Sequence, residues 1–192
     1  MSRFWTKFLL TLGYLYVSGP LPVRWEHAVR LRKLVRPGDV LAGTAGTILR
    51  WFTPGPYVHT AFVVDADRVV EAVGEGVLPP HPVEAFVMEE RIGVALWRPR
   101  YPEPREERVR AAAEKALSLV GKPYDFGFRP DIGRLYCHEL TALCLEAGGL
   151  RVERVSPARI VTASEIRRQC DEVWTNQTVD KEQTAEMKND VA

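Results

Sequence analysis

The order of two patterns along the chain constrains the fold most: short β-like runs come first and helical runs follow. Between residues 37 and 99, short β-branched and apolar runs are separated by turn signals such as Pro37-Gly38-Asp39. From residue 106 onward, apolar residues recur at helical spacing. Because helices do not alternate regularly with strands, a doubly wound parallel sheet is not expected. The order predicts an α+β domain built on an antiparallel sheet.

The same patterns predict individual elements. Strands are expected at residues 40–42, 59–64, 68–72 and 94–98, and helices at residues 106–120 and 136–147. Thr162 and Glu165 form a capping box that predicts a last short helix. We detect no internal repeat and no long linker between residues 37 and 174, so a single domain at 36–174 is expected.

Composition excludes several classes of protein. The 192 residues carry 26 basic and 25 acidic side chains, so no general electrostatic attraction to nucleic acid is expected. Three widely spaced cysteines are too few for a disulfide framework, and four histidines without a CxxC motif do not make a zinc ribbon.

The two ends of the chain differ from its middle. Residues 1–20 form an apolar arm whose most apolar stretch, residues 4–17, is shorter than the ~20 apolar residues of a spanning helix. It could pack on the domain, lie in a membrane interface or act as a signal peptide, although Pro20 disfavours cleavage there. A cytoplasmic or peripheral membrane location, with possible membrane contact through this arm, is slightly favoured. Residues 175–192 are polar and are expected to be a disordered tail.

Cys137 is the strongest candidate for a nucleophile. Residues 131–136 are irregular and residues 139–147 are helical, so Cys137 is expected at or next to a helix N-terminus. There the helix dipole and the backbone N–H groups favour a thiolate and could bind an oxyanion. Alternatively, Cys137 is a buried apolar residue, as we expect for Cys144 in the middle of the same helix. Nothing in the sequence distinguishes Cys170.

His59 and Glu71 are predicted to lie on one face of a hairpin. His59 opens an otherwise apolar run, and Glu71 stands twelve residues later on the returning strand. With a turn centred on Asp65, the two side chains would be directly opposed, about 5 Å apart at Cβ. Glu71 could then orient the imidazole, leaving its other nitrogen free as a base. A one-residue slip would separate them, and a polar pair at the sheet rim is the alternative.

The other histidines are weaker candidates for the base. His138 follows the candidate nucleophile, but adjacent helical residues point about 100° apart. His81 lies in a stiff proline-rich loop, where it could line a cleft but is expected to be exposed, and His27 is expected on the surface of a basic helix. His59, Glu71 and His81 could in principle supply three metal ligands, but we expect neither a metal nor another cofactor.

Five short motifs occur in an order that resembles a known family. They are Pro37–Val40, Tyr57–Ala61, Val70–Ala72, Gly121–Asp125 and Tyr136–Leu140. The chain resembles the YiiX/YebB-like proteins, a circularly permuted branch of the NlpC-type papain-like cysteine peptidases, related to the lecithin:retinol acyltransferase family. In this branch the histidine precedes the cysteine, as here. The resemblance spans residues 36–166 and implies a permuted papain-like α+β fold, with the cysteine helix packed against an antiparallel sheet carrying the histidine.

The resemblance also implies residue roles. Cys137 matches the nucleophile, His59 the general base and Glu71 the third, polar residue. Tyr57 and Tyr124 match aromatic positions and are expected to line the substrate pocket. Related proteins often carry serine before the histidine and after the cysteine, whereas this chain has Val58 and His138, so a pocket of different polarity is expected.

The expected activity is that of a cysteine peptidase or amidase acting through a thioester intermediate. The substrates implied are amide bonds, such as those of cell-wall peptides, or ester and amide bonds of lipids. Acyl transfer to an amine is an open alternative. A non-catalytic binding or structural module with the same fold is the rival from another class, and a metal-dependent hydrolase is a third. The sequence predicts no oligomeric state.

Overall fold

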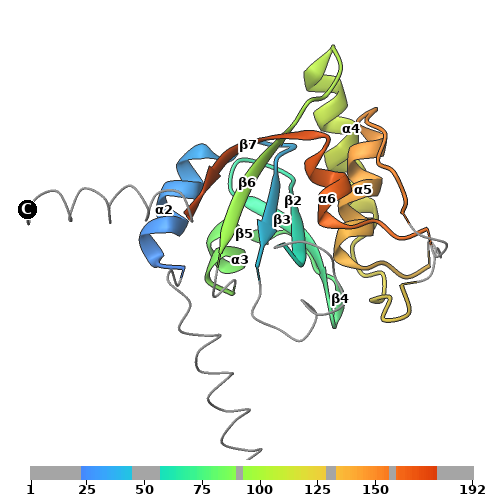
Figure 1. Cartoon of the computed structure of the whole chain (residues 1–192), viewed down its shortest axis with the longest axis horizontal. Helices are drawn as coiled ribbons and strands as arrows, with labels where there is room; N and C mark the ends of the chain where they lie inside the picture. Colours follow the sequence, from blue (N-terminus) through green and yellow to red (C-terminus); the bar gives the residue numbers. More distant parts are fainter. Residues whose placement is uncertain (1–22, 45–56, 90–92, 129–132, 156–158, 177–192) are drawn as a thin grey trace, which may run out of the picture.

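An antiparallel sheet runs through the centre of the molecule, between two layers of helices (Figure 1). The structure is a computed structural model and describes residues 23–44, 57–89, 93–128, 133–155 and 159–176. The described elements are, in chain order, α2 (Trp25–Leu34), β1 (Val40–Gly43), β2 (His59–Val63), β3 (Arg68–Val73), β4 (Gly76–Val77), β5 (His81–Pro82), α3 (Val83–Glu89), β6 (Val94–Pro99), α4 (Arg105–Ser118), α5 (Cys137–Ala147), α6 (Ala163–Arg167) and β7 (Cys170–Thr175).

The order of the strands in the sheet differs from their order in the chain. The described residues form a seven-stranded sheet in the order β4-β3-β2-β1-β6-β7, with β5 also paired to β3. The strand pairs are antiparallel. Strand β1 lies between β2 and β6, and all its residues are buried because helices cover both faces of the sheet. The predicted α+β class with an antiparallel sheet is confirmed.

The β2–β3 hairpin has a different register from the predicted one. Ala61 lies opposite Glu71, so the turn is centred one residue later than Asp65. The Asp65 carboxylate fixes this turn by accepting a hydrogen bond from the backbone N–H of Arg68, at 3.0 Å. His59 is therefore diagonal to Glu71 and not directly opposite it. Because the pairing differs by two residues along β2, both side chains remain on one face of the sheet.

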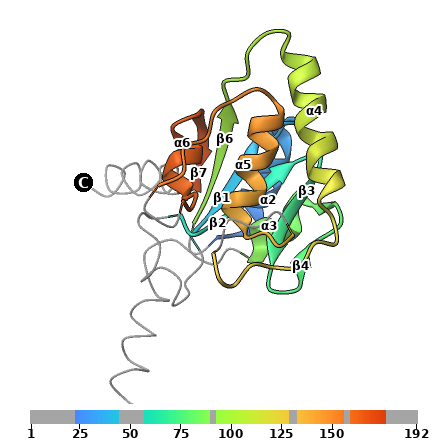
Figure 2. The same ribbon diagram turned by 90° about the vertical axis from the view of Figure 1, so that its right-hand side faces the viewer.

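Successive side chains of a strand point to opposite faces of the sheet, so the strands contribute to two apolar cores. Phe62 of β2 points into the core that α4 and α5 complete, where it joins Leu140. Ala61, its neighbour, points into the second core with Leu31 of α2 and Phe86 of α3. Figure 2 shows α4 and α5 in front of the sheet and α2 and α3 behind it. Each buried large side chain in these cores contributes about 1.5–3 kcal/mol of burial free energy.

Helix α5 begins at Cys137, one residue after the predicted start at residue 136, so Cys137 lies at the helix N-terminus as expected. Tyr136 is the N-cap residue with an extended backbone, and its side chain accepts no capping hydrogen bond. The helix ends at Ala147, before Gly148 and Gly149, and Gly149 adopts a left-handed conformation with φ of 89°. The predicted capping box that starts α6 is also present.

The N-terminal edge of the domain lies before the predicted limit at residue 36. Helix α2 buries Ala28 and Leu31 in the second core. The prediction that His27 is a surface residue is wrong, because His27 is 6% exposed and its ring packs against Trp174 of β7, with centroids 5.9 Å apart. The predicted apolar arm at residues 1–20 lies outside the described residues.

The C-terminal edge also extends further than predicted. Thr175 pairs with Ala95 in β7, and the Asn176 side chain accepts a hydrogen bond from the backbone N–H of Val94 at 2.9 Å. The prediction of a tail beginning at residue 175 is therefore wrong for these two buried residues, and residues 177–192 lie outside the described part. Within the described residues, no helix has the length and apolar character needed to cross a bilayer.

Candidate active site

The start of helix α5 and the start of strand β2 bring Cys137 and His59 together. The Cys137 sulfur lies 3.9 Å from the carbonyl oxygen of Val58, the residue before β2. His59 is the first residue of β2, directly after Val58, and a negative charge on Cys137 is one of the causes that raise the pKa of its ring. Cys137 is buried in the resting protein, with 5% of its surface exposed. The predicted nucleophile and base therefore lie close together, although they are far apart in the amino-acid sequence.

Glu71 holds the other side of the His59 ring. The Nε2 atom of His59 makes a short hydrogen bond to Glu71 Oε2, which leaves Nδ1 as the nitrogen available to the thiol. Phe86 of α3 stacks on the imidazole at a centroid distance of 5.5 Å and an interplanar angle of 20°. Burial opposes protonation of His59, but Cys137 and Glu71 outweigh it and raise its pKa well above the usual value. The ring is therefore set up to hold a proton beside the sulfur.

Glu71 is a buried carboxylate between two imidazoles. It is 1% exposed, and its second oxygen, Oε1, lies 2.7 Å from Nε2 of His81. Burial would raise the pKa of Glu71, but His59 and His81 outweigh burial and lower it to about 2. The carboxylate is therefore ionised over the whole physiological range, as an orienting group must be.

His81 lies beside Glu71, although the sequence interpretation did not include it among the site residues. The prediction of an exposed loop residue is wrong, because strand β5 pairs His81 with Val69 and turns the ring towards Glu71. The available signal was the grouping of His81 with His59 and Glu71 as possible metal ligands. That grouping identified the right neighbours but assigned them a different chemistry.

His138 lies beside the nucleophile in the chain but is not set up to carry its proton. Burial, with a further contribution from the charge of His59, lowers the pKa of His138 to about 3. Its ring is therefore neutral near pH 7, and its Nε2 atom has no hydrogen-bond partner among the described residues.

Two threonines fix the cysteine helix to the histidine strand. Thr141, one turn after Cys137, donates a hydrogen bond to the Cys137 carbonyl oxygen at 3.1 Å. The hydroxyl oxygen of Thr60 lies 3.0 Å from that of Thr141. Since the Thr141 proton is already used, Thr60 is the donor in this second bond. The pair sets the position of α5 relative to β2, and neither threonine was singled out from the sequence.

Tyr124 lies at the nucleophile, as the sequence interpretation anticipated in part. Burial raises the pKa of Tyr124 strongly, and the nearby Cys137 raises it further, because a negative charge on the sulfur disfavours a second one on the phenol oxygen. Next to it, the ring of Phe126 is 71% exposed and packs against Tyr124 at 4.9 Å. These two rings make an aromatic wall beside the sulfur.

The loop that carries Tyr124 is held by backbone hydrogen bonds. Val77 of β4 donates to the carbonyl of Lys122 at 2.8 Å and accepts from Gly121 at 2.9 Å. Gly76 makes this approach possible, because a Cβ at its φ of 118° would lie 2.6 Å from the Lys122 carbonyl oxygen. The position of Tyr124 is therefore set by the sheet and not by the loop alone.

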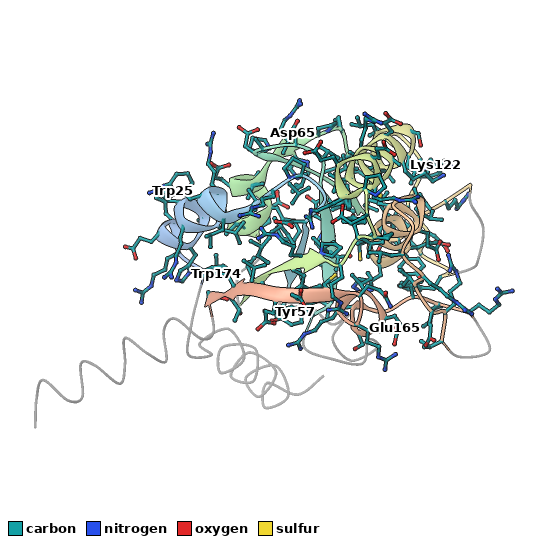
Figure 3. All side chains as sticks on the ribbon, turned by 90° about the horizontal axis from the view of Figure 1, so that it is seen from above. Trp25, Tyr57, Asp65, Lys122, Glu165 and Trp174 are labelled. Atoms are coloured by element: carbon teal, nitrogen blue, oxygen red, sulfur yellow. The ribbon has the colours of Figure 1, made fainter. Side chains whose placement is uncertain are left out.

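Tyr57 occupies a different environment. Its ring is buried and packs edge-to-face on Trp97, with centroids 5.0 Å apart, and its hydroxyl interacts with Thr175. Figure 3 shows Tyr57 beside β7. Its role in lining the substrate pocket stays a prediction, and its packing is that of a core side chain.

The other two cysteines are buried away from these partners. Cys144 belongs to the core between α4 and α5, and burial raises its thiol pKa strongly. Burial also raises the pKa of Cys170, to about 12. Among the described residues, no group of three or more His, Cys, Asp and Glu side chains is arranged to hold a metal ion, although His59, Glu71 and His81 are neighbours.

Comparison with known proteins identifies the same architecture. Residues 34–185 match the family described as "Permuted papain-like amidase enzyme, YaeF/YiiX, C92 family". Among solved structures, the chain is similar to the metalloprotein yiiX from Escherichia coli O157:H7, with 20% identity and a TM-score of 0.59. The similarity covers 72% of this chain and 96% of that chain. No curated protein matches the sequence.

Proposed function

Since this chain belongs to the C92 family of permuted papain-like amidases and is thus a kind of cysteine hydrolase, we propose that Cys137 is its nucleophile. We also propose that the protein cleaves amide bonds of peptides. The observation that carries the proposal is the grouping of Cys137, His59 and Glu71: the sulfur lies against the carbonyl of the residue before His59, and His59 is hydrogen-bonded to Glu71. This is the nucleophile, base and orienting group of thiol acyl-transfer chemistry.

The proposed reaction begins with transfer of the Cys137 thiol proton to Nδ1 of His59. The thiolate attacks the amide carbon, and the new S–C bond gives a tetrahedral oxyanion. As the C–N bond breaks, the imidazolium returns its proton to the leaving nitrogen, leaving a thioester and a free amine. Water, deprotonated by His59, then attacks the thioester, and release of the carboxylic acid restores the thiol. Glu71 keeps its charge and stabilises the imidazolium at both stages.

The backbone N–H of Cys137, at the N-terminus of α5, is the first proposed donor to the oxyanion. The helix dipole favours negative charge at this end, and Tyr136 provides no side-chain cap that would compete for the first N–H groups. We assign the Tyr124 hydroxyl as the second donor, because it interacts with the Cys137 sulfur and its raised pKa keeps its proton in place. Both groups are oriented before the substrate binds.

The substrate class follows from the surroundings of the sulfur. The rings of Tyr124 and Phe126 offer an apolar wall, and Phe126 is largely exposed in the unliganded protein. Such a wall favours a peptide that carries an apolar or aromatic side chain next to the scissile bond. The acyl chain of a lipid ester could pack on the same two rings, so experiment must decide between an amide and an ester substrate.

The test is covalent trapping of the acyl-enzyme. The protein is mixed with p-nitrophenyl acetate and, separately, with a mixture of short peptides, and adducts are located by peptide mass spectrometry. We expect a thioester on Cys137 and turnover that disappears in Cys137→Ser but persists in the matched control Cys144→Ser. Turnover by Cys137→Ser, or acylation at another residue, would refute the assignment.

Two additions separate the alternatives. If acyl transfer is the main reaction, an added amine such as glycinamide will divert most of the thioester into a new amide, whereas a hydrolase will still release mainly the acid. If a metal takes part, a chelator will abolish turnover. We expect hydrolysis to dominate and to survive the chelator.

A further inference from the structure

The carboxylate of Glu71 contacts two histidines, but the chemistry proposed above uses only one of them. Oε2 bonds to His59, while Oε1 faces Nε2 of His81 at 2.7 Å. Apart from His81, Oε1 has no polar partner among the described residues. Burying a carboxylate oxygen with so few polar partners destabilises the folded protein unless a positive charge faces it. The second imidazole therefore needs its own explanation.

The surroundings of His81 fix its protonation state. Its Nε2 faces the Glu71 carboxylate, and its Nδ1 lies 3.2 Å from the carbonyl oxygen of Pro79. Both neighbours are acceptors only, and a neutral imidazole has a proton on just one nitrogen. The ring satisfies both neighbours only as an imidazolium. Consistently, its pKa is raised, most by Glu71.

The local backbone holds this ring in place. Strand β5 consists of His81 and Pro82 and pairs with β3, so that His81 lies opposite Val69, two residues before Glu71. Prolines on both sides of His81 restrict the backbone torsions of the segment. Side chains on one face of a strand recur every second residue, which places His81 and Glu71 on the same face.

We propose that His81 is a positioning residue, held as an imidazolium, that fixes Glu71 so that its other oxygen stays on His59. Only the expected effect of His81 on turnover rests on the proposed function, because the contacts of His81 and Glu71 are present in the protein without substrate. The active site is then a chain of four groups, Cys137, His59, Glu71 and His81. The fourth group both orients the carboxylate and shares its negative charge.

This arrangement makes the basicity of His59 depend on His81. The charged or titratable groups that face His81 are Glu71 from β3 and the exposed Glu89 from α3, and His59 lies across the carboxylate. While His81 is positive, it withdraws part of the Glu71 charge from His59 and repels the His59 imidazolium. When His81 loses its proton or is replaced by a neutral residue, the pKa of His59 rises. A residue with a purely structural role would leave that pKa unchanged.

Three variants separate orientation from charge. His81→Ala removes both the contact with Glu71 and the positive charge. His81→Gln keeps a hydrogen-bond donor towards Glu71 but carries no charge. Glu89→Gln, which removes an exposed carboxylate near His81, is the matched control. Each variant is studied by nitrogen-15 NMR titration of the His59 ring, assigned with His59→Gln, by peptide or ester hydrolysis, and by thermal unfolding.

We expect the His59 midpoint to rise by about one pH unit in both His81 variants. We expect kcat/KM to fall about tenfold or more in His81→Ala and to recover substantially in His81→Gln, because a misplaced catalytic group is slow and the glutamine restores the contact. Glu89→Gln should match the wild type in both measurements.

An unchanged His59 midpoint in His81→Ala and His81→Gln would overturn the proposal, as would a loss of thermal stability without any change in that midpoint. The NMR titration needs no turnover. If the wild-type protein forms no Cys137 adduct, the proposed function fails, while the role of His81 is still decided by the titration.

Discussion

The start and the middle of helix α5 hold the same residue type in opposite surroundings. Cys137 at the first position meets His59 and Tyr124, whereas Cys144 two turns later lies in an apolar core. Both are buried, so burial does not distinguish them. What differs is the set of partners: strand β2 and the loop after α4 bring polar groups to the first turn, while α4 itself supplies apolar ones to the middle. Burial without polar partners raises the pKa of the Cys144 thiol, and a buried thiol of this kind is inert.

The largest expected difference between these two regions is in reactivity. With iodoacetamide at neutral pH, Cys137 should be alkylated at least about a thousandfold faster than Cys144 or Cys170, because the buried thiols react only after local opening. Mass spectrometry of timed digests gives the three rates separately. Similar rates at all three sites would remove the distinction on which the site assignment depends.

The partners of the first turn can be weakened without touching the helix. Glu71→Gln keeps the shape of the side chain but removes the charge that stabilises the His59 imidazolium. We expect hydrolysis and Cys137 alkylation to slow by about a hundredfold or more. Glu75→Gln, which alters an exposed carboxylate in the turn between β3 and β4, is the control and should retain wild-type rates. Equal rates for Glu71→Gln and the wild type would exclude an orienting role.

The same carboxylate predicts a pH dependence of stability. The pKa of Glu71 is about 2 in the folded protein, whereas the usual value for a glutamate, expected in the unfolded chain, is 4.5. The unfolded state therefore binds the proton of this carboxylate more readily. The stabilisation is fully present above about pH 4.5 and is lost as the pH falls towards 2. Urea titrations across this window should show a steeper loss of stability in the wild type than in Glu71→Gln. Parallel curves would contradict the low pKa.

A smaller effect is expected from the aromatic wall beside the first turn. Tyr124→Phe keeps the ring that packs on Phe126 and removes the hydroxyl that touches Cys137. If this hydroxyl stabilises the oxyanion, kcat should fall by about tenfold or more with little change in KM. A change confined to KM would assign Tyr124 to substrate binding alone.

The smallest effect is expected from the threonine pair that joins α5 to β2. Thr141→Val leaves the buried Thr60 hydroxyl without its partner and should cost about 1–3 kcal/mol of stability and only a few-fold in kcat. The double variant Thr60→Val/Thr141→Val should be less unstable than the sum of the single changes, since no unpaired group remains. Strict additivity would show that the two hydroxyls do not interact.

Much of the fold follows from local patterns. The strand at β1, the hairpin of β2 and β3, and the boundaries of α5 were predictable, because β-branched runs, an Asp-rich turn and a Gly148-Gly149 stop act over short distances. Family membership and the permuted papain-like fold were also predicted and are confirmed. The register of the hairpin was wrong, since a turn at Asp65 allows more than one pairing and packing selects between them.

The parts that escaped prediction depend on contacts between distant segments. Strand β7 looks polar in sequence, because three of its residues are exposed, and only its pairing with β6 and the burial of Trp174 make it a strand. His81 was missed for the same reason: a two-residue strand has no periodicity to detect. The candidate roles of Cys137, His59 and Glu71 came from the predicted helix start, the predicted hairpin and the resemblance, and the structure adds a hydrogen bond between His59 and Glu71.

Strand β7 has a consequence for how the protein is made. All four members of the proposed site precede residue 170, so a growing chain contains the nucleophile, the base and both supporting groups before β7 has left the ribosome. Until then, β6 is an open sheet edge, and its closure waits for the hydrogen bond from Val94 to Asn176. Open edges of this kind pair readily with other chains. Protection against aggregation during synthesis therefore depends on the strand that follows the nucleophile, and not on the strands that carry its partners.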